Sequence, residues 1–305
     1  MNFISIIIIT YNRPDETLAL LQNLKEQKDL NSCVKEILLL NNASTVQYDN
    51  VIDFILNNKN LSIEYINSTE NMGVAKGRNF LIEKAQNPYL LVLDDDVVFA
   101  DDGAISIINT MFDKQQYVVN NTGIITLNIY YFDTKARQKN ALPHKRYEIY
   151  KDKKWFLTYY FTGAAHLMKK ELFDKTGFYP EDFFYGMEEY DLSYRAINSG
   201  YTLAYDNSVK VWHKESPIGR ITNKEKMAMM WFNKSKVAWK YLPKKYFYST
   251  VLMWSLEYLA KTKFDIRGYF KTWRKVCSLR KLVLRQAISK KALKYLKSVQ
   301  ARLWY

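Results

Sequence analysis

The sequence predicts an α/β protein built on a mostly parallel β-sheet, and three observations lead to this fold class. Short β-branched apolar runs alternate with helical patterns over the first hundred residues. The continuous apolar character of these runs is typical of strands that are buried on both faces. Most of the runs end in polar clusters, as expected where ligands bind beyond the carboxyl ends of parallel strands. Apolar residues make up 48% of the 305, so the chain can form a sizeable core.

The first hundred residues contain four predicted strands, and helices separate them. The strands are predicted at residues 3–9, 36–40, 62–66 and 89–93. The helices are predicted at 15–28, at 49–58, and from a glycine-containing loop at 71–79 through Ala85. Strands that alternate with helices in this way indicate right-handed βαβ units in one sheet.

The rest of the chain divides into two parts. Residues 120–215 are less regular and rich in Tyr and Phe, and we expect them to complete the sheet. From about residue 221 the pattern becomes helical, aromatic and basic. We therefore expect a domain over 1–220, whose halves meet at about residue 100, and a helical C-terminal region over 221–305.

All of the excess positive charge lies in this C-terminal region. From Tyr241 to the end there are 16 Lys and Arg against two acids, whereas the first 240 residues carry no net charge. This asymmetry points to an anionic partner surface, either a membrane or a nucleic acid. A solvated basic helix face is the alternative.

Residues 246–260 are apolar and aromatic, with lysines on both sides. They are fewer than the roughly 20 residues that span a bilayer. Aromatic residues with basic flanks favour a helix that lies in the interface of an anionic membrane. A helix packed on the preceding domain is the alternative.

The cysteines and the N-terminus indicate a cytoplasmic protein. Cys33 and Cys277 are the two cysteines, far apart, which excludes a disulfide framework and a zinc cluster. The first apolar run lacks the basic segment and the cleavage site of a signal peptide. It is also too short to cross a membrane.

Two acidic clusters are the strongest candidates for chemistry. Asp94, Asp95 and Asp96 follow a predicted strand, and adjacent carboxylates need a compensating cation, which Mg²⁺ or Mn²⁺ would supply. A solvated acidic turn is the alternative. Glu188, Glu189 and Asp191 begin a predicted helix and exceed what capping of a helix requires. One of them could act as a general base.

His213 and the pair Lys76 and Arg78 are further candidates for the same site. His213 could serve as a neutral third ligand to a metal held by the first cluster, although a lone histidine is more often structural. Lys76 and Arg78 lie beside a predicted helix start and could bind phosphate. Their loop matches neither the dinucleotide-binding fingerprint nor the P-loop.

Together these segments resemble, in order and spacing, the family 2 glycosyltransferases of the GT-A fold, including their rhamnosyl- and galactosyltransferase-like members. The matching segments are 5–13, 40–44, 71–79, 94–96, 162–165, 188–192 and His213, and the resemblance covers roughly residues 3–240. It implies a metal-dependent enzyme that uses Mn²⁺ or Mg²⁺. Such an enzyme transfers a sugar from a nucleoside diphosphate to an acceptor hydroxyl, with inversion at the anomeric carbon.

The resemblance also implies roles for single residues. The nucleotide-sugar would contact Thr10, Asn12, Arg13, Asn41, Arg78, Asp94 and Asp95, and the metal would be held by Asp96 and His213. Asn41 replaces an aspartate that commonly contacts the base. An amide oxygen can still accept from a uracil or thymine imide, so UDP- or dTDP-sugars are favoured.

Glu189 occupies the position of the general base, where the family usually has aspartate. Glu188 and Asp191 are three residues apart on one helical face, so we expect them to form a structural or acceptor-positioning pair. The assignment of the base to Glu189 rather than Glu188 stays open at this point.

The expected acceptor is a glycan or a lipid-linked saccharide of bacterial surface polysaccharide synthesis, reached from the inner face of the cell membrane. Three alternatives remain. A nucleotide-sugar pyrophosphorylase would need a glycine-rich loop after the first strand, and residues 10–14 contain no glycine. A nucleic-acid-binding protein would leave the acidic clusters unexplained, so no nucleic acid is expected. The departures at Asn41 and Glu189 allow an inactive scaffold.

Overall fold

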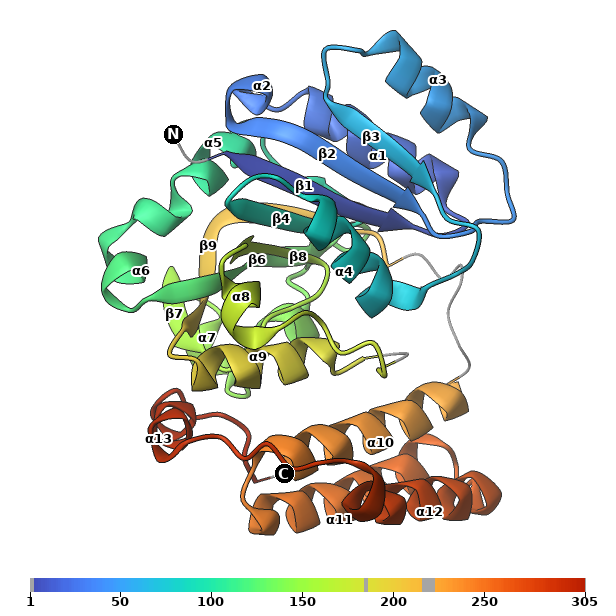
Figure 1. The fold of residues 1–305 in the computed structure, drawn as a ribbon, viewed down its shortest axis with the longest axis vertical. Coiled ribbons are helices and arrows are strands. Elements are labelled where there is room, and N and C mark those ends of the chain that lie inside the picture. The colour runs from blue at the N-terminus through green and yellow to red at the C-terminus, as the bar shows by residue number, and fades with distance from the viewer. Residues whose placement is uncertain (1–2, 184–185, 216–222, 305) are drawn as a thin grey trace.

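The computed structural model describes residues 3–183, 186–215 and 223–304, and within them a nine-stranded mixed sheet forms the centre of the molecule (Figure 1). The strands are β1 (Ile4–Thr10), β2 (Val34–Asn41), β3 (Ile63–Asn67), β4 (Tyr89–Asp94), β5 (Val97–Phe99), β6 (Thr122–Tyr131), β7 (Trp155–Thr158), β8 (Ala165–Lys169) and β9 (Thr202–His213). Their order is β3-β2-β1-β4-β8-β6-β9-β5, and β7 also pairs with β9.

The helices flank this sheet and continue beyond it. Those of the first 200 residues are α1 (Pro14–Lys25), α2 (Leu30–Cys33), α3 (Asp49–Asn57), α4 (Gly73–Lys84), α5 (Ala104–Asn109), α6 (Gln115–Val119), α7 (Tyr147–Tyr150), α8 (Leu172–Thr176) and α9 (Glu188–Asn198), with 3₁₀ turns η1 (Met111–Asp113) and η2 (Lys139–Ala141). The C-terminal helices are α10 (Asn223–Tyr241), α11 (Lys244–Lys261), α12 (Ile266–Leu282) and α13 (Lys290–Ser298).

The predicted parallel arrangement is confirmed for the first four strands. β1 pairs in parallel with β2 and β4, and β2 pairs in parallel with β3. Ile7 of β1 belongs to the core on one face of the sheet, whereas Ile6 and Ile8 belong to the core on the other. Burial on both faces explains why β1 is apolar without interruption. The register places Thr10 beside Asn41, and Ile9 beside Asp94, so the polar strand ends meet at one edge.

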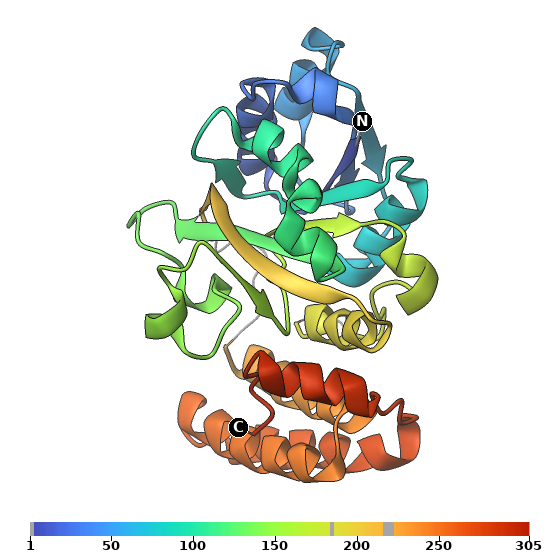
Figure 2. The same ribbon diagram turned by 90° about the vertical axis from the view of Figure 1, so that its left-hand side faces the viewer.

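The second half of the sheet is mixed. β8 is antiparallel to both β4 and β6, and β6 is parallel to β9. β9 is long, and it also pairs antiparallel with β5 and β7 (Figure 2). The last residue of β9, His213, therefore lies near the end of β4.

Helix α4 begins earlier than expected. Residues 71–79 were expected to form a loop, but α4 starts at Gly73, whose φ of 71° is readily adopted by glycine. Gly77 then lies against the sheet, since a Cβ at this position would be 3.0 Å from Ile9 Cδ1. This close approach turns Arg78 towards the strand ends.

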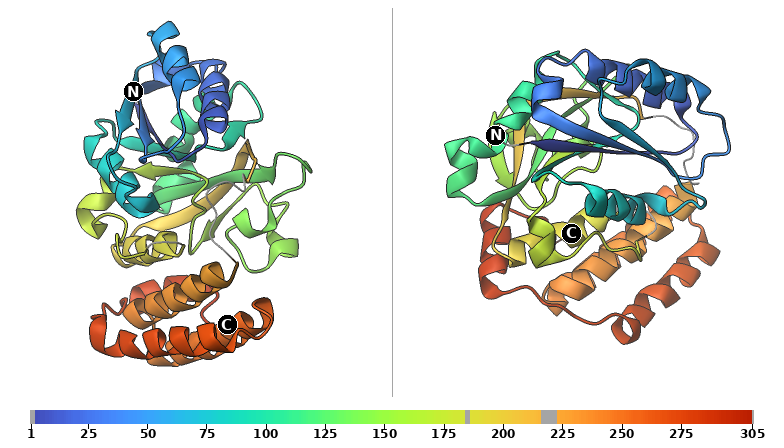
Figure 3. Two further views of the ribbon diagram at one scale, coloured as in Figure 1. Left: turned by 90° about the vertical axis from the view of Figure 1, so that its right-hand side faces the viewer. Right: turned by 45° about the horizontal axis from the view of Figure 1, so that its top comes forward.

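The C-terminal helices form a layer against the side of the domain where α9 lies (Figures 1 and 3). Lys240 Nζ lies 2.5 Å from Asp191 Oδ2, and Asn233 Nδ2 donates to the Gly186 carbonyl at 3.0 Å. Buried residues of this layer, among them Trp231 and Leu279, belong to the same apolar core as one face of the sheet. The boundary expected at residue 220 lies outside the described residues.

The apolar segment 246–260 falls within α11. Among the described residues, no helix is both long enough and apolar enough to cross a membrane. One face of α11 packs inward through Tyr246, Phe247 and Tyr258, and the opposite face is exposed. The helix therefore packs on the protein, as one of the two sequence alternatives expected, and the interfacial membrane helix stays a prediction.

Candidate active site

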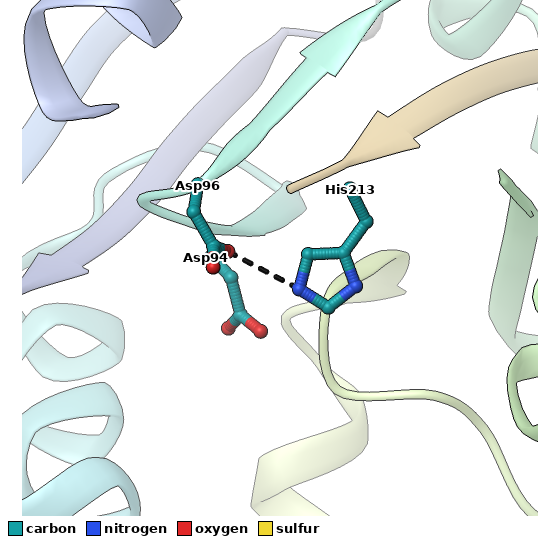
Figure 4. Close-up of side chains that lie close together, drawn as sticks. All are labelled: Asp94, Asp96 and His213. Atoms are coloured by element: carbon teal, nitrogen blue, oxygen red, sulfur yellow. Dashed lines mark ion pairs between the residues drawn. The ribbon is translucent and has the colours of Figure 1, made fainter. Parts of the chain in front are cut away.

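Three side chains meet where β4 and β9 end (Figure 4). Asp94 is the last residue of β4, and Asp96 lies in the turn to β5. His213 ends β9 and is opposite Val97 in the β5–β9 pairing, which brings its Nε2 to 3.2 Å from Asp96 Oδ1. One ligand atom from each of Asp94, Asp96 and His213 lies within 4.8 Å of the others.

The orientation of His213 suits a metal ligand. Its Nδ1 lies 3.0 Å from the side-chain oxygen of Gln138, which can only accept, so Nδ1 carries a proton and Nε2 faces Asp96. Burial lowers the pKa of His213, but the hydrogen bond and charge of Asp96 outweigh it and raise the pKa overall. Two carboxylates and one imidazole at this spacing fit Mn²⁺ or Mg²⁺. Sequence reasoning missed Gln138, which no motif marks.

Arg13 and Asp95 lie beneath this cluster. Arg13 Nη1 is 2.9 Å from Asp95 Oδ1 and 3.2 Å from Asp96 Oδ2. Asp95 is buried, and burial raises the pKa of its carboxyl to about 7 even though Arg13 opposes the shift. Asp95 was expected to contact the nucleotide-sugar. Its buried position instead gives it the role of holding Arg13 in place.

The loop expected to bind the nucleoside is tied together by its own side chains. Thr10 is buried, and its hydroxyl lies 2.6 Å from that of Tyr48. Asn12 has a φ of 58°, and its side-chain oxygen accepts from the Thr45 amide at 2.7 Å. Thr10 therefore stabilises the loop through its hydrogen bond to Tyr48. Sequence reasoning missed Tyr48.

Asn41 closes the turn after β2. Its side-chain oxygen accepts from the Ser44 amide at 3.0 Å, and its amide nitrogen donates to the Tyr65 hydroxyl at 2.8 Å. The side chain is buried. An amide oxygen can accept two hydrogen bonds, so the expected contact of Asn41 with the base stays a prediction.

Arg78 connects the acidic clusters of the two halves. Nη2 donates to Asp94 Oδ1 at 3.1 Å and to the Gly163 carbonyl at 3.0 Å, and Nη1 lies 3.6 Å from Glu189 Oε1. The Arg78 side chain is 4% exposed, whereas that of Asp94 is 37% exposed. Arg78 was expected to contact the nucleotide directly. Its fork of donors fixes Asp94 relative to Glu189, and the contact with the nucleotide stays a prediction.

Glu188 and Glu189 begin α9 after two residues with left-handed backbone, Gly186 and Met187. Burial raises the pKa of Glu188, and the charge of Glu189 raises it further. Burial also raises the pKa of Glu189, although Arg78 opposes this shift. A carboxylate whose pKa is moved towards neutrality is suited to general base catalysis.

Asp191 does not have the acceptor-positioning role that was expected of it. It is fully buried, and Lys240, Tyr241 and Arg195 all contact its carboxylate. The prediction that it shares a face with Glu188 overlooked the helices that cover this face. Asp191 instead attaches α9 to α10.

The mixed α/β sheet, with an Asp–Asp–His cluster at its strand ends and an acidic helix start opposite, defines the class of GT-A glycosyltransferases. The chain belongs to glycosyl transferase family 2, whose family model matches residues 5–177. This match ends before α9, so the placement of Glu188 and Glu189 rests on the geometry above.

Similar proteins agree with this membership. An uncharacterized protein of Haemophilus influenzae is 32% identical over 184 residues, which are 59% of this chain and 94% of that protein. The teichoic acid poly(glycerol phosphate) polymerase of Staphylococcus epidermidis is 29% identical over 155 residues, 50% of this chain but only 20% of that protein. The mannosyltransferase PcManGT from Pyrobaculum calidifontis, solved with GDP-Man and Mn²⁺, shares the fold with a TM-score of 0.60 at 16% identity, covering 97% of this chain and 78% of that one.

Proposed function

We propose that this protein transfers a sugar from a nucleoside-diphosphate sugar to a hydroxyl of a saccharide or lipid-linked acceptor, with inversion. One observation carries the proposal: Arg78 bridges Asp94 of the strand-end cluster and Glu189 of the acidic helix start. A donor-binding group and a candidate base are thereby held a fixed distance apart. This arrangement suits attack by an acceptor hydroxyl on a bound donor.

Asp94, Asp96 and His213 would hold Mn²⁺ or Mg²⁺, which when bound supplies positive charge to the leaving diphosphate. Support comes from the similar mannosyltransferase that was solved with Mn²⁺ and GDP-Man. UDP- and dTDP-sugars are the first donors to test. Asn41 supports them, because its side-chain oxygen accepts one bond from Ser44 and can accept a second from a uracil or thymine imide.

In the proposed reaction Glu189 accepts the proton of the acceptor hydroxyl. The hydroxyl oxygen forms a bond to the anomeric carbon while the bond from that carbon to the diphosphate oxygen breaks on the opposite face. Arg78 orients the Glu189 carboxylate, and Gly163 leaves room for it, since a Cβ at residue 163 would collide with Glu189 Oε1.

We further propose that the protein works in the cytoplasm, attached to the inner face of the cell membrane. Tyr248, Leu252 and Leu256 are about half exposed and stand four residues apart, so they form one stripe along α11. Phe264 and Phe270 add exposed aromatic rings at the adjoining turn and on α12. An apolar stripe inside a region of net positive charge suits an anionic bilayer surface. The teichoic acid relative supports a role in cell-surface polymer synthesis.

A thermal-shift screen of nucleotide sugars, with and without Mn²⁺, tests the proposal, because a ligand that binds the native state raises the melting temperature by mass action. We expect one donor to stabilise the protein only with metal, and Asp96→Ala to abolish the shift. The control is Asp102→Ala, which removes an exposed acid outside the cluster. Full transferase activity in excess EDTA would contradict the metal assignment. Donor binding without any turnover would favour the inactive scaffold.

A further inference from the structure

A small cavity lies between α9 and the C-terminal helices. Its walls include Tyr190 and Tyr194 of α9, Lys234 of α10, Trp254 of α11, and Arg302 after α13. Its volume is about 50 Å³. Since a buried water needs about 10–15 Å³, the cavity accommodates a group of several heavy atoms. None of these residues belongs to the donor site described above.

Lys234 differs from Lys236 and Lys240, two lysines that lie on another face of α10. Lys236 is paired with Asp182 and Lys240 with Asp191. Among the described residues, no carboxylate forms an ion pair with Lys234. Its ammonium lies 4.8 Å from the ring centre of Trp254 and 5.3 Å from that of Tyr190.

The surroundings of Lys234 favour an added negative charge. Burial and, to a smaller extent, the nearby charge of Arg302 lower the pKa of Lys234 to about 8. Tyr190 and Tyr194 stay neutral in this range, because burial raises the pKa of both hydroxyls. An anion between the two cations would offset both their repulsion and the cost of burial.

The cavity adjoins the catalytic turn. Met187 also lines it, and Tyr190 follows Glu189 directly, so their Cα atoms are about 3.8 Å apart. The Tyr190 ring stacks on that of Tyr160 at 4.5 Å, shortly before Gly163 in the chain. The cavity therefore lies against the same first turn of α9 that carries Glu189, and its walls include no residue of the strand-end cluster.

We propose that this cavity is an acceptor subsite that binds a phosphate group through Lys234 and Arg302. Guanidinium and ammonium groups together are the usual partners of phosphate oxygens. The phosphate could belong to a phosphodiester polymer or to a lipid-linked diphosphate. Its assignment to the acceptor rests on the proposed function, whereas binding of the anion does not.

Calorimetric titration with sulfate tests the subsite, because sulfate has the shape of phosphate and keeps its charge between pH 6.5 and 9.5. We expect Lys234→Met to weaken binding by about tenfold or more, in line with the loss of a charged hydrogen bond. Lys234→Arg should retain it, and Lys294→Met, which removes an exposed lysine of α13, should leave it unchanged. Wild-type affinity should fall as pH rises through about 8, where Lys234 loses its proton, and Lys234→Met should lack this step.

Equal sulfate binding by wild type and a folded Lys234→Met would overturn the proposal, since the sulfate would then occupy another site, such as Arg13. Turnover assays identify the source of the phosphate. Lys234→Met should raise KM for the acceptor that carries the phosphate, either a polyol-phosphate oligomer or a diphosphate-linked saccharide, and leave a neutral saccharide unaffected. If sulfate binds as expected but no donor is turned over, the subsite stands and the proposed function fails.

Discussion

At the scale of single residues, Arg78 decides how the site is arranged. Its guanidinium holds Asp94 from one half of the site and Glu189 from the other, and the Gly163 carbonyl completes the set. The buried, planar guanidinium therefore sets where the Glu189 carboxylate lies. The position of Glu189, the proposed base, therefore depends on Arg78 and Gly163, which take no proton from the acceptor.

Glu189→Gln tests the base. We expect kcat to fall by about 10²–10⁴-fold with donor affinity near that of wild type, because the amide keeps the size of the side chain but cannot accept the proton. The raised pKa of Glu189 also predicts that wild-type activity is lost, as pH falls, above the range of an ordinary glutamate. Single-turnover rates and separate donor titrations measure both effects. Glu188→Gln is the matched control. If Glu188→Gln is inactive and Glu189→Gln is active, Glu188 and not Glu189 is the general base.

Gly163→Ala tests the positioning of Glu189. The new methyl group would collide with Glu189 Oε1, which is the end of a flexible side chain, so the side chain should move while the fold is kept. Misplacement by about 1 Å can cost on the order of 100-fold in rate. We expect kcat to drop by at least about tenfold with little change in melting temperature. Gly103→Ala is the control, because no atom lies within 4 Å of a Cβ there; equal activity of the two variants would refute the positioning role.

The end of β4 was the part of the site that sequence could predict. Asp94 ends this strand, and parallel pairing with β1 brings it to the edge where Thr10 lies. His213 reaches Asp96 through the antiparallel pairing of β5 with β9, and no strand was predicted there. Tyr65 and Lys240, the partners of Asn41 and Asp191, could not be predicted either, because they come from segments that local pattern does not place nearby.

At the scale of elements, α9 serves both the site and the C-terminal layer. Its first turn carries the acidic pair, and Asp191, one turn later, pairs with Lys240 of α10 and Arg195 of α9. Sequence periodicity predicted the strands and helices of the first hundred residues. It could not show that α10 covers α9, because that contact joins residues about 50 positions apart.

Asp191→Asn tests this attachment. The Asp191 carboxylate is fully buried, and removing its charge leaves two cations without their partner. Breaking a buried pair from one side typically costs about 3–5 kcal/mol of stability, which a urea unfolding midpoint would register. Asp102→Asn removes an acid whose side chain is 57% exposed from a pair with Lys28, whose side chain is 69% exposed. It should cost less than about 1 kcal/mol. Equal losses in the two variants would contradict the structural role of Asp191.

At the scale of the whole molecule, the apolar stripe of α11 faces away from the sheet. We expect the protein to sediment with anionic vesicles, and Leu252→Ser with Leu256→Ser to reduce this binding, because both side chains are more than half exposed. Removal of residues 241–305 is a poorer test, since Tyr258 and Leu279 belong to the buried core. Val119→Ser is the control, as it removes an exposed apolar side chain of α6.

Two results would count against membrane attachment by this stripe. Equal binding to neutral and anionic vesicles would show that electrostatic attraction does not contribute to membrane binding, because that attraction requires anionic lipid. Unchanged sedimentation of the variant with Leu252→Ser and Leu256→Ser would show that the apolar stripe does not contribute to membrane binding. The stripe itself could not be predicted from the sequence, since apolar and polar residues are spread around α11 and only packing decides which face is buried.

The pairing of β5 with β9 has a consequence for how the protein reaches its native state. Asp96 and His213 lie more than one hundred residues apart in the chain, and β9 is the last of the described strands in sequence. Contacts between such distant segments form slowly, because a long loop must close before any pairing is gained. Recovery of donor binding during refolding would therefore follow completion of the whole sheet, and a nucleotide sugar would select the fully assembled chain over every partly folded one.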